Sequence, residues 1–496
     1  MRTGGHKASR RQVLQATAAS LGGLTILRSA KTAFSYQAND RLRLAIVGMA
    51  GYGAWHGFTE ALHTYGNVEY AVSCDVDHRK VNKVYELWDA RAKEWPSSTD
   101  KQQQEAAKSF YSSLSRKRPP LFADFRRMLD EAGDKFDAVV VATPDHAHAV
   151  IAAAALRAGK PVFCEKPLTI NAHEARTLLR LAQETGLPTQ LNNHGCAKAA
   201  FRRGVEIIRE GHLGDVREVH IFFNRGGRNF KQTPKGSQPV PPELDWDRWL
   251  AQLRWREYHP EWINRIAWRE TSIGELGNFG PHTGHMAFMG LNIRDLWNGD
   301  VKSLPIRVHA ECSETNQISY PRWEKIHWEV PARGLQPAVN ITWHNGVTPE
   351  NPPGTQKLLQ GLLRKFDATD QEVKELLPYA GCLIVGSKGL IATGSHNTDI
   401  RLLPGERFGK LEQKQPKTLP VSPGHYKEWI DACRGGQQPL SNFLNAAPFA
   451  EFLTIGSVAT RFPEQVIEYY PATGTISNHP AAAERLTYEY RQGYRL

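Results

Sequence analysis

The sequence predicts an α/β chain, in which an N-terminal doubly wound parallel sheet precedes an α+β domain with an open sheet. From residue 41 to residue 191, short apolar runs alternate with helical segments, as in a parallel sheet covered by helices on both faces. After about residue 192, strand-like segments alternate apolar and polar side chains, as strands with one covered face do. We therefore predict one domain over residues 39–192 and a second over residues 193–496.

In the first domain, strand and helix signals follow one another in sequence. Leu42–Val47 is a continuous apolar run followed by a glycine turn, which predicts a buried strand and then a helix from about Ala54. Residues 96–120 are polar with a helical composition, and we interpret them as an excursion from the sheet. The same reasoning predicts strands over 68–74, 136–142, 161–164 and 187–191, and helices over 77–95, 147–158 and 171–185.

The second domain has fewer and longer signals. Residues 216–223 and 338–343 alternate apolar and polar side chains, which predicts antiparallel strands with one covered face. Residues 426–433 and 447–460 have the composition of helices that close the domain. A homo-oligomer formed through the open sheet is compatible with this organisation.

Composition indicates a globular protein. The apolar content of 41% and charged content of 23% match the globular average. The net charge is +11, but residues 1–38 hold six basic residues and no acidic one, so the remainder carries only +5. Such a small surplus, without a basic stripe interleaved with aromatic residues, argues against a nucleic-acid partner. The six cysteines include no Cys-x-x-Cys pair and are interpreted mostly as core thiols.

The first 38 residues have the organisation of a signal segment. Arg10 and Arg11 precede an apolar stretch over residues 16–27, and small residues follow to residue 38. The apolar stretch is shorter than the roughly 20 residues that span a bilayer, so no stable membrane insertion is expected. The segment resembles a twin-arginine signal, although Val13 stands where Phe is usual and Gln15 where Lys is common. We predict export to the periplasm or medium; a disordered basic leader on a cytoplasmic enzyme is the alternative.

The turn after the first strand carries a dinucleotide-binding pattern. It reads Gly-Met-Ala-Gly-Tyr-Gly over residues 48–53, so Ala50 occupies the second glycine position of Gly-x-Gly-x-x-Gly and Gly51 is additional. Asp75 ends the next strand, where an acid accepts hydrogen bonds from ribose hydroxyls and repels a 2′-phosphate. NAD is therefore favoured over NADP, although Arg79 and Lys80 weaken this argument. The alternative is a glycine turn that serves packing only.

Two further segments carry a family resemblance. Residues 142–148 read Ala-Thr-Pro-Asp-His-Ala-His, and residues 159–168 read Gly-Lys-Pro-Val-Phe-Cys-Glu-Lys-Pro-Leu. Together they resemble the Gfo/Idh/MocA family of oxidoreductases, whose members join a Rossmann domain to an open-sheet domain. Residues 244–250, 386–389, 441–443 and 488–493 resemble a secreted bacterial branch of that family.

The resemblance implies roles for particular residues. The lysine of the Glu-Lys-Pro motif lies by the nicotinamide and the substrate hydroxyl, and this role falls on Lys166. Burial beside a cationic nicotinamide would lower the pKa of such a lysine and let it share proton transfer. The expected cofactor contacts are Gly48, Ala50, Gly51, Gly53, Asp75, Thr143, Pro144, His148, Glu165, Lys166 and Pro167.

The second catalytic element of the family is Asp-x-x-x-His, often followed by another Asp three residues on. Residues 278–285 align with it, placing His282 on the catalytic histidine, which suits a base near neutral pH. Asn278 replaces the family's first acid and His285 the later one, which puts ordinary dehydrogenation in doubt. A metal bound by His282 and His285 is disfavoured, because no cysteine or clear carboxylate set accompanies them. The expected substrate contacts are Asn193, His194, Arg225, Trp268, Arg269, Asn278 and His285.

These features favour an enzyme that moves a hydride between a sugar or polyol carbinol and a tightly bound NAD. The alternative is a redox-neutral, NAD-dependent glycoside hydrolase or epimerase of the same superfamily, which would oxidise its sugar transiently and return the hydride. A non-catalytic sugar or dinucleotide sensor is disfavoured, because both Lys166 and His282 are present.

Overall fold

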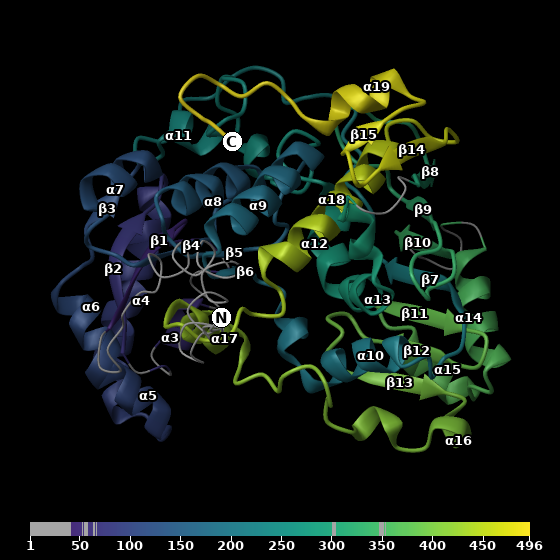
Figure 1. Cartoon of the computed structure of the whole chain (residues 1–496). Helices are drawn as coiled ribbons and strands as arrows, with labels where there is room; N and C mark the ends of the chain where they lie inside the picture. The colour runs from purple at the N-terminus through teal and green to yellow at the C-terminus, as the bar shows by residue number, and fades with distance from the viewer. Residues whose placement is uncertain are drawn as a thin grey trace, which may run out of the picture.

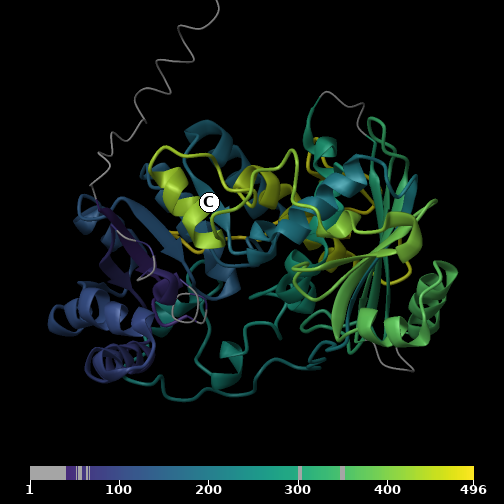
Figure 2. The same ribbon diagram turned by 90° about the horizontal axis from the view of Figure 1, so that it is seen from below.

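The computed structural model describes residues 41–51, 53, 58–62, 65, 67–299, 304–346, 352 and 354–496. The predicted signal segment, residues 1–38, lies outside the described residues, as does most of the helix predicted from Ala54. Figures 1 and 2 show two lobes, each built on one sheet, with α18 (Phe443–Ala459) between them. None of the described helices is both long and apolar enough to cross a membrane.

The first lobe contains a six-stranded sheet in the order β3-β2-β1-β4-β5-β6, and every neighbouring pair is parallel. Its central strands are apolar on both faces, as expected where helices cover both sides. The order reverses at β1, whose neighbours are β2 and β4, and such a switch point opens a crevice at the carboxyl edge. The strands are β1 (Leu42–Val47), β2 (Val68–Cys74), β3 (Leu121–Phe122), β4 (Ala138–Val141), β5 (Val162–Cys164) and β6 (Thr189–Leu191). The prediction of a doubly wound parallel sheet is thereby confirmed.

Most predicted helices of this lobe are found within a few residues of their expected bounds. They include α4 (His78–Glu94), α8 (His148–Arg157) and α9 (Ala172–Thr185). The excursion predicted over 96–120 is helical, with α5 (Lys101–Ala106), a π-helical segment (Ala107–Tyr111) and α6 (Ser112–Arg116). The short strand β3 and the helix α7 (Phe125–Ala132) were not predicted. Their signals are weak, because β3 has two residues and α7 mixes charged residues with only two buried ones.

The second lobe contains a nine-stranded mixed sheet in the order β13-β12-β11-β7-β10-β9-β8-β14-β15. Residues 216–223 form β7 (Val216–Phe223) and residues 338–343 fall on β10 (Val339–Asn345), as predicted. The prediction that both are antiparallel strands is wrong in one respect: β7 and β10 pair parallel with each other. Each is antiparallel to its other neighbour in the sheet. More than one hundred residues separate β7 from β10, which allows the crossover connection that parallel neighbours require.

The remaining strands of this sheet are β8 (Ile306–Cys312), β9 (Glu324–Val330), β11 (Ala380–Gly386), β12 (Leu390–Thr393), β13 (Ile400–Leu403), β14 (Ile467–Tyr470) and β15 (Thr475–Ile476). One face packs on α10 (Ala199–Arg209), α12 (Gly274–Thr283), α13 (His285–Gly290) and α18 in the main hydrophobic core. On the other face, α14 (Thr355–Lys365) and α15 (Asp370–Leu376) form a smaller core with β11 and β12. Self-association through this sheet stays a prediction.

The chain after residue 193 returns to the first lobe at several places. Trp429 of α17 (His425–Cys433) packs in the core beside β1 and β4. Phe443 and Ala447, in the first turns of α18, join the core on the other side of the parallel sheet, while Phe452 joins the core of the second lobe. Tyr494 near the C-terminus also packs against the first lobe. Contacts therefore cross the predicted division at residue 192, and one helix serves both cores.

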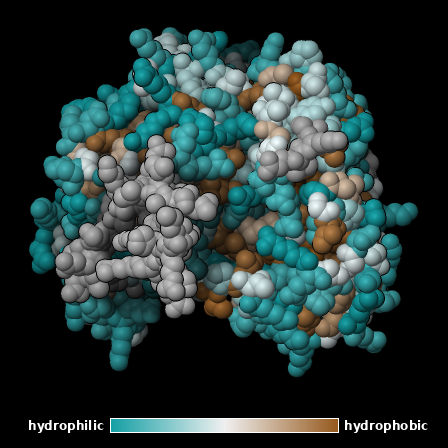
Figure 3. All heavy atoms as spheres, in the orientation of Figure 1, coloured by the Kyte–Doolittle hydropathy of each residue, from teal (hydrophilic) through white to brown (hydrophobic). Residues whose placement is uncertain are grey.

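All six cysteines are free, and five of them are buried, which agrees with their interpretation as core thiols. The face in Figure 3 is mainly hydrophilic, with apolar residues in separate patches.

Candidate active site

The glycine turn lies where β1 meets β4. Gly48 has a left-handed backbone (φ +79°), and its N–H donates to the carbonyl oxygen of Cys74 at 2.8 Å. A Cβ added to Gly48 would lie 2.6 Å from the main-chain oxygen of Ala142, and one added to Gly51 would lie 2.0 Å from the same atom. Only glycine lets the turn approach the end of β4 this closely. Gly48, Ala50 and Gly51 line the crevice, so the backbone of this turn would lie close to a pyrophosphate bound there.

Asp75 follows β2 and fixes the turn from the other side. Its carboxylate accepts hydrogen bonds from the N–H of Ala50 at 2.9 Å and from the N–H of Asp77 at 3.0 Å. Burial raises the pKa of Asp75, although both hydrogen bonds oppose that shift. Arg79 is held by Asp77 at 2.8 Å, whereas Lys80 faces the crevice. The carboxylate of Asp75 and the cationic side chain of Lys80 therefore both lie near the expected ribose position.

A long cleft begins at this turn. Its first part is lined by Val47, Gly48, Ala50, Gly51, Cys74, Asp75, Val76, Asp77, Lys80, Ala123, Asp124, Phe125, Ala142, Thr143, Pro144, Ala147 and Ile151 of the first lobe. Residues from beyond the first sheet complete the wall: Arg248, Trp249, Ala251, Ile263, Arg265 and Tyr494. Predicted cofactor contacts Gly48, Ala50, Gly51, Asp75, Thr143 and Pro144 all lie here.

A second pocket continues from the first and shares Ala142, Thr143 and Arg265 with it. Its lining also includes Gly53, Asp145, His148, Glu165, Lys166, Asn192, His194, Asn278, Phe279, His282, His396 and Tyr426. The structure thus brings both predicted catalytic residues into one pocket that opens onto the predicted dinucleotide cleft.

Lys166 lies at this junction. Its ammonium donates to the side-chain oxygen of Asn278 at 2.7 Å and to the main-chain oxygen of the same residue at 2.8 Å. Burial, followed by the charge of Arg265, lowers the pKa of Lys166 to about 8. A lysine with such a pKa can exchange a proton near neutral pH.

Asn278 also connects the lysine to a buried carboxylate. Its amide nitrogen donates to Glu275 at 2.8 Å, and Glu275 lies 3.4 Å from Arg225. Arg225, a predicted substrate contact, is half exposed and outside the lining of both pockets. Arg225 is connected to Lys166 through Glu275 and Asn278. Asn278 replaces the acid of the family motif, but a carboxylate, that of Glu275, is present three residues earlier.

His282 is held by Asn193. Its Nδ1 lies 3.4 Å from the side-chain oxygen of Asn193, whose amide nitrogen points at the carbonyl oxygen of Pro281 and at Nδ1 of His285. Because that oxygen only accepts, Nδ1 of His282 carries the proton and Nε2 is left as the acceptor. Burial, with Lys166 as the leading nearby charge, holds the pKa of His282 well below its usual value. His282 is therefore neutral near pH 7 and can accept a hydrogen bond at Nε2.

The predicted contacts Asn193 and His285 lie behind His282, outside the pocket lining. His285 is fully buried, and its ring stacks on Phe449 at 4.7 Å. Burial lowers the pKa of His285 to about 3, as for a neutral core histidine. His285 thus supports Asn193, which in turn orients His282.

Other imidazoles gather around His282. His396, in the loop between β12 and β13, lies 4.5 Å from His282 between ring centroids, and it stacks on His194 at 5.0 Å. His194 was predicted from the resemblance, whereas His396 carries no motif and is brought here only by the second sheet. Arg265 was also missed; it donates to the buried Asp145 at 2.6 Å. Among the described residues, no group of three or more His, Cys, Asp or Glu side chains could hold a metal ion.

The remaining predicted cofactor contacts surround Lys166. His148 places its two ring nitrogens 2.7 Å and 2.8 Å from the carbonyl oxygens of Pro167 and Thr143. Pro167 itself is outside the pocket lining. Glu165 accepts from Asn192, and a Cβ on Gly53 would overlap its carboxylate. These contacts hold the turn that carries Lys166.

Two predicted substrate contacts lie elsewhere. Trp268 is 1% exposed, and its indole N–H donates to the carbonyl oxygen of Glu261 at 2.8 Å. The guanidinium of Arg269 is buried and donates to the main-chain oxygens of Asn316 and Ser319. Trp268 packs against Phe230 and Trp262, and neither Trp268 nor Arg269 lines the pocket that contains Lys166 and His282.

These residues fit a dinucleotide. The cradle would be closed by a Cβ at Gly48 or Gly51, the acid Asp75 stands at the end of β2, and the cleft follows the carboxyl edge at the switch point. The neighbouring pocket places proton-transfer groups where the nicotinamide end would lie.

Comparison with known proteins agrees with this geometry. Residues 42–193 match the family described as "Oxidoreductase family, NAD-binding Rossmann fold" (GFO_IDH_MocA). The 1,5-anhydro-D-fructose reductase of Ensifer adhaerens is 38% identical over 86 residues, which is 17% of this chain and 26% of that protein. Inositol 2-dehydrogenase 1 of Saccharopolyspora erythraea is 35% identical over 133 residues, 26% of this chain and 38% of that protein. The matched stretches thus span well under half of these curated relatives.

The fold is similar over most of the chain. The WlbA dehydrogenase of Bordetella pertussis, solved with NADH and UDP-GlcNAcA, aligns with a TM-score of 0.52 at 14% identity, covering 87% of this chain and 99% of that one. At this identity the likeness concerns the fold, which includes both lobes. Residues 42–193 are therefore similar to the NAD-binding Rossmann domain of the Gfo/Idh/MocA oxidoreductase family.

Proposed function

We propose that this protein moves a hydride between a carbinol carbon of a sugar or polyol and NAD held in the long cleft. The observation that carries the proposal is the junction of the two pockets, where Lys166 and His282 line the space that adjoins the dinucleotide cleft. The relatives named for reduction of an anhydro sugar and dehydrogenation of inositol support the carbohydrate class. The redox-neutral hydrolase or epimerase alternative is not favoured by these comparisons.

In the oxidation direction, the substrate C–H bond supplies a hydride and its O–H bond supplies a proton. Bound NAD supplies the hydride acceptor. Lys166 in its neutral form takes the hydroxyl proton, and its pKa of about 8 makes this form accessible near neutral pH. Asn278 positions the ammonium through the 2.7 Å hydrogen bond. His282, neutral and with Nε2 free to accept, orients the same hydroxyl.

We propose NAD rather than NADP as the cofactor, and tight retention of it. Asp75 supports this preference because a 2′-phosphate beside a buried carboxylate would meet a like charge. Lys80 faces the same cleft, and its positive charge would favour the 2′-phosphate of NADP.

The test is a single-turnover measurement that does not depend on free cofactor. The purified protein, loaded with NAD, is mixed with a panel of sugars, polyols and sugar acids, and the absorbance of reduced nicotinamide is followed at protein concentration. A substrate should reduce up to one equivalent of NAD, with the matching carbonyl product found by mass spectrometry. If loaded protein showed no nicotinamide reduction with any panel member, and no reoxidation of NADH with the matching carbonyl compounds, the proposal would fail.

We further propose that the protein is exported. The paired Arg10 and Arg11, with the apolar stretch over residues 16–27, support a twin-arginine signal. Replacing both arginines by lysine should leave precursor in the cytoplasm, whereas the same change at Arg2 and Arg28 should not. Fractionation with an antibody would measure this, and unchanged export of the first variant would contradict the proposal.

A further inference from the structure

The last ten residues cross from the second lobe to the rim of the dinucleotide cleft. In Figure 1 the chain runs from α19 (Pro480–Ala483) over the top of the molecule to a C-terminus near α11 (Trp246–Leu250). The hydroxyls of Tyr488 and Tyr490 donate to the buried carboxylate of Glu174 at 3.1 Å and 3.0 Å. We call residues 487–496 the tail.

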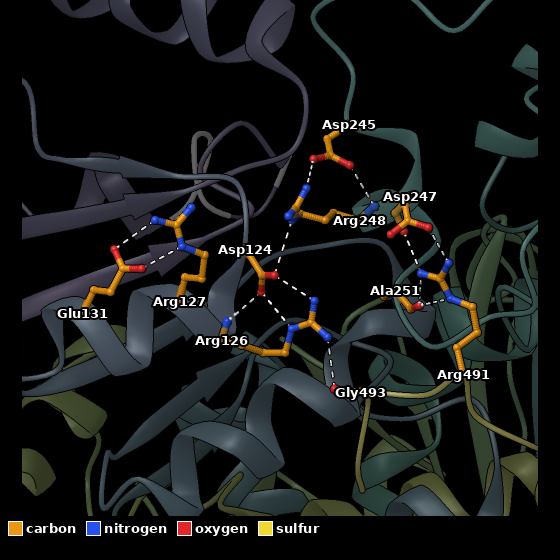
Figure 4. A network of polar contacts seen from close by, with 10 residues as sticks. All are labelled: Asp124, Arg126, Arg127, Glu131, Asp245, Asp247, Arg248, Ala251, Arg491 and Gly493. Carbon is orange, nitrogen blue, oxygen red and sulfur yellow. Dashed lines mark hydrogen bonds and ion pairs between the residues drawn. The ribbon is translucent and has the colours of Figure 1, made fainter.

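Arg491 fastens the tail to α11 and to Ala251, the residue that follows this helix (Figure 4). Its guanidinium donates to the Asp247 carboxylate at 2.6 Å, to the main-chain oxygen of Asp247 at 2.8 Å, and to the main-chain oxygen of Ala251 at 2.9 Å and 2.7 Å. Its side chain is 18% exposed. These bonds depend on the planar, forked arrangement of the guanidinium N–H groups, which the ammonium of a lysine could not reproduce. Ala251 itself lines the dinucleotide cleft.

Arg126 fastens the end of the tail to the segment after β3. It pairs with Asp124 at 2.7 Å and donates to the main-chain oxygen of Gly493 at 3.0 Å, as Figure 4 shows. The guanidinium carbon of Arg126 lies 4.3 Å from the ring centroid of Tyr494, and the guanidinium carbon of Arg491 lies 5.5 Å from the same centroid. Tyr494 is 8% exposed and lines the cleft. Its ring is thus fixed by two cations and closes part of the cofactor wall.

The position of this wall follows from the sheet. The N–H of Asp75 donates to the carbonyl oxygen of Phe122 at 2.9 Å, so Asp75 lies beside the segment that begins at Ala123. Ala123, Asp124 and Phe125 line the cleft next to Tyr494. The tail therefore meets the cleft at the ribose and adenine end, away from Lys166 and His282.

We propose that the tail is part of the dinucleotide site and that Tyr494, held by Arg126 and Arg491, retains the adenosine end of the cofactor. This rests on the proposed function, because it requires a dinucleotide in the cleft. Release then needs local opening of the tail, so the tail slows dissociation more than association. Such retention suits an enzyme that keeps its cofactor between turnovers.

The test compares Tyr494→Ala and Arg491→Gln with a matched control variant outside the tail, Arg254→Gln. Arg254 contacts tail residue Glu489 at 3.5 Å, but both side chains are exposed and outside the dinucleotide cleft. Stopped-flow fluorescence measures NADH dissociation after mixing with excess NAD. We expect both test variants to release NADH about ten-fold faster or more, since affinity changes within one site fall mainly on dissociation. Arg254→Gln should stay within about two-fold of wild type.

A second measurement needs no variant. Hydrogen exchange of the wild-type tail peptide, residues 487–496, should slow when NADH is added. If the variants fold, unchanged hydrogen exchange of the tail together with an unchanged rate of NADH dissociation would overturn the proposal. If the variants do not fold, unchanged hydrogen exchange of the wild-type tail would overturn it. If the wild-type protein bound neither NADH nor NADPH, the proposed function itself would fail, which is a separate outcome.

Discussion

Replacing Asn278 by aspartate tests how this residue affects the pKa of Lys166, the proposed catalytic lysine. The substituted carboxylate would stand where the amide oxygen now lies, 2.7 Å from the ammonium of Lys166. An opposite charge this close favours the charged lysine and shifts a pKa by about 1–3 units, or about 1.4–4 kcal/mol of differential interaction. We therefore expect the pKa of Lys166 to rise from about 8 to between about 9 and 11, a range that includes the ordinary value of lysine.

The neighbourhood of Asn278 calls for one additional variant. Its amide nitrogen now donates to Glu275 at 2.8 Å, so an aspartate would face a second carboxylate there and one of the two would retain a proton. The double variant Asn278→Asp, Glu275→Gln removes that competition and should show the full shift. Asn278→Ala removes the amide without adding charge, and should leave the pKa of Lys166 within about half a unit of wild type, because burial remains its main cause.

The assay is competitive labelling of Lys166 with acetic anhydride across pH, read by mass spectrometry of the labelled peptide. It requires no substrate. The labelling midpoint should move to higher pH in both aspartate variants and not in Asn278→Ala. Once a substrate is known, the limb of the pH profile that reports neutral Lys166 should move in the same direction. Equal midpoints in wild type and the double variant would refute the assignment of Asn278 as the group that holds the lysine.

Further predictions concern catalysis, cofactor choice and stability. Lys166→Ala and His282→Ala should each lower turnover by about 10²–10⁴-fold while the protein still binds NADH, and near-normal turnover would reject the role of that residue. Asp75→Ser should weaken NAD binding by about 1–3 kcal/mol and reduce discrimination against NADP, measured by calorimetry; unaltered discrimination would contradict this. Burial raises the pKa of Glu174 to about 7, so this carboxyl stabilises the fold at low pH and its contribution is lost as pH rises from about 4.3 toward 7. Glu174→Gln should therefore match wild type near pH 4 in urea unfolding and be more stable at pH 8 by up to about 4 kcal/mol, whereas a less stable variant at pH 8 would contradict the shift.

Local patterns allowed most of the first lobe to be predicted. A buried parallel strand is a continuous apolar run, so Leu42–Val47 and the run ending at Val141 stand out from their surroundings. The glycine turn and Asp75 were predictable because each follows a strand end, and all strand ends of a parallel sheet meet at one edge. The strand β3 was missed because two residues carry no periodicity.

The site was harder to predict where it depends on distant contacts. His396 and Arg265 enter the pocket from the second lobe, and neither lies in a motif. Asn193 was placed against substrate, but it lies behind His282 and orients it, a difference that only side-chain packing decides. Trp268 was expected to face a sugar ring, yet a buried aromatic residue has the same appearance in sequence whether it packs on substrate or on core. Tyr494 lies more than four hundred residues from the glycine turn, and the family-like segment 488–493 before it did not indicate that it lines the cleft.

We propose that the cleft between the glycine turn and Lys166 holds a nicotinamide dinucleotide. Native mass spectrometry of the purified protein, with and without added NADH, tests it directly. We predict one NAD(H) per chain, either present on purification or taken up on addition, and its loss in a variant with alanine substituted at Gly51, where a Cβ would lie 2.0 Å from the oxygen of Ala142. A protein that stayed free of dinucleotide after addition of NADH and of NADPH would contradict the account.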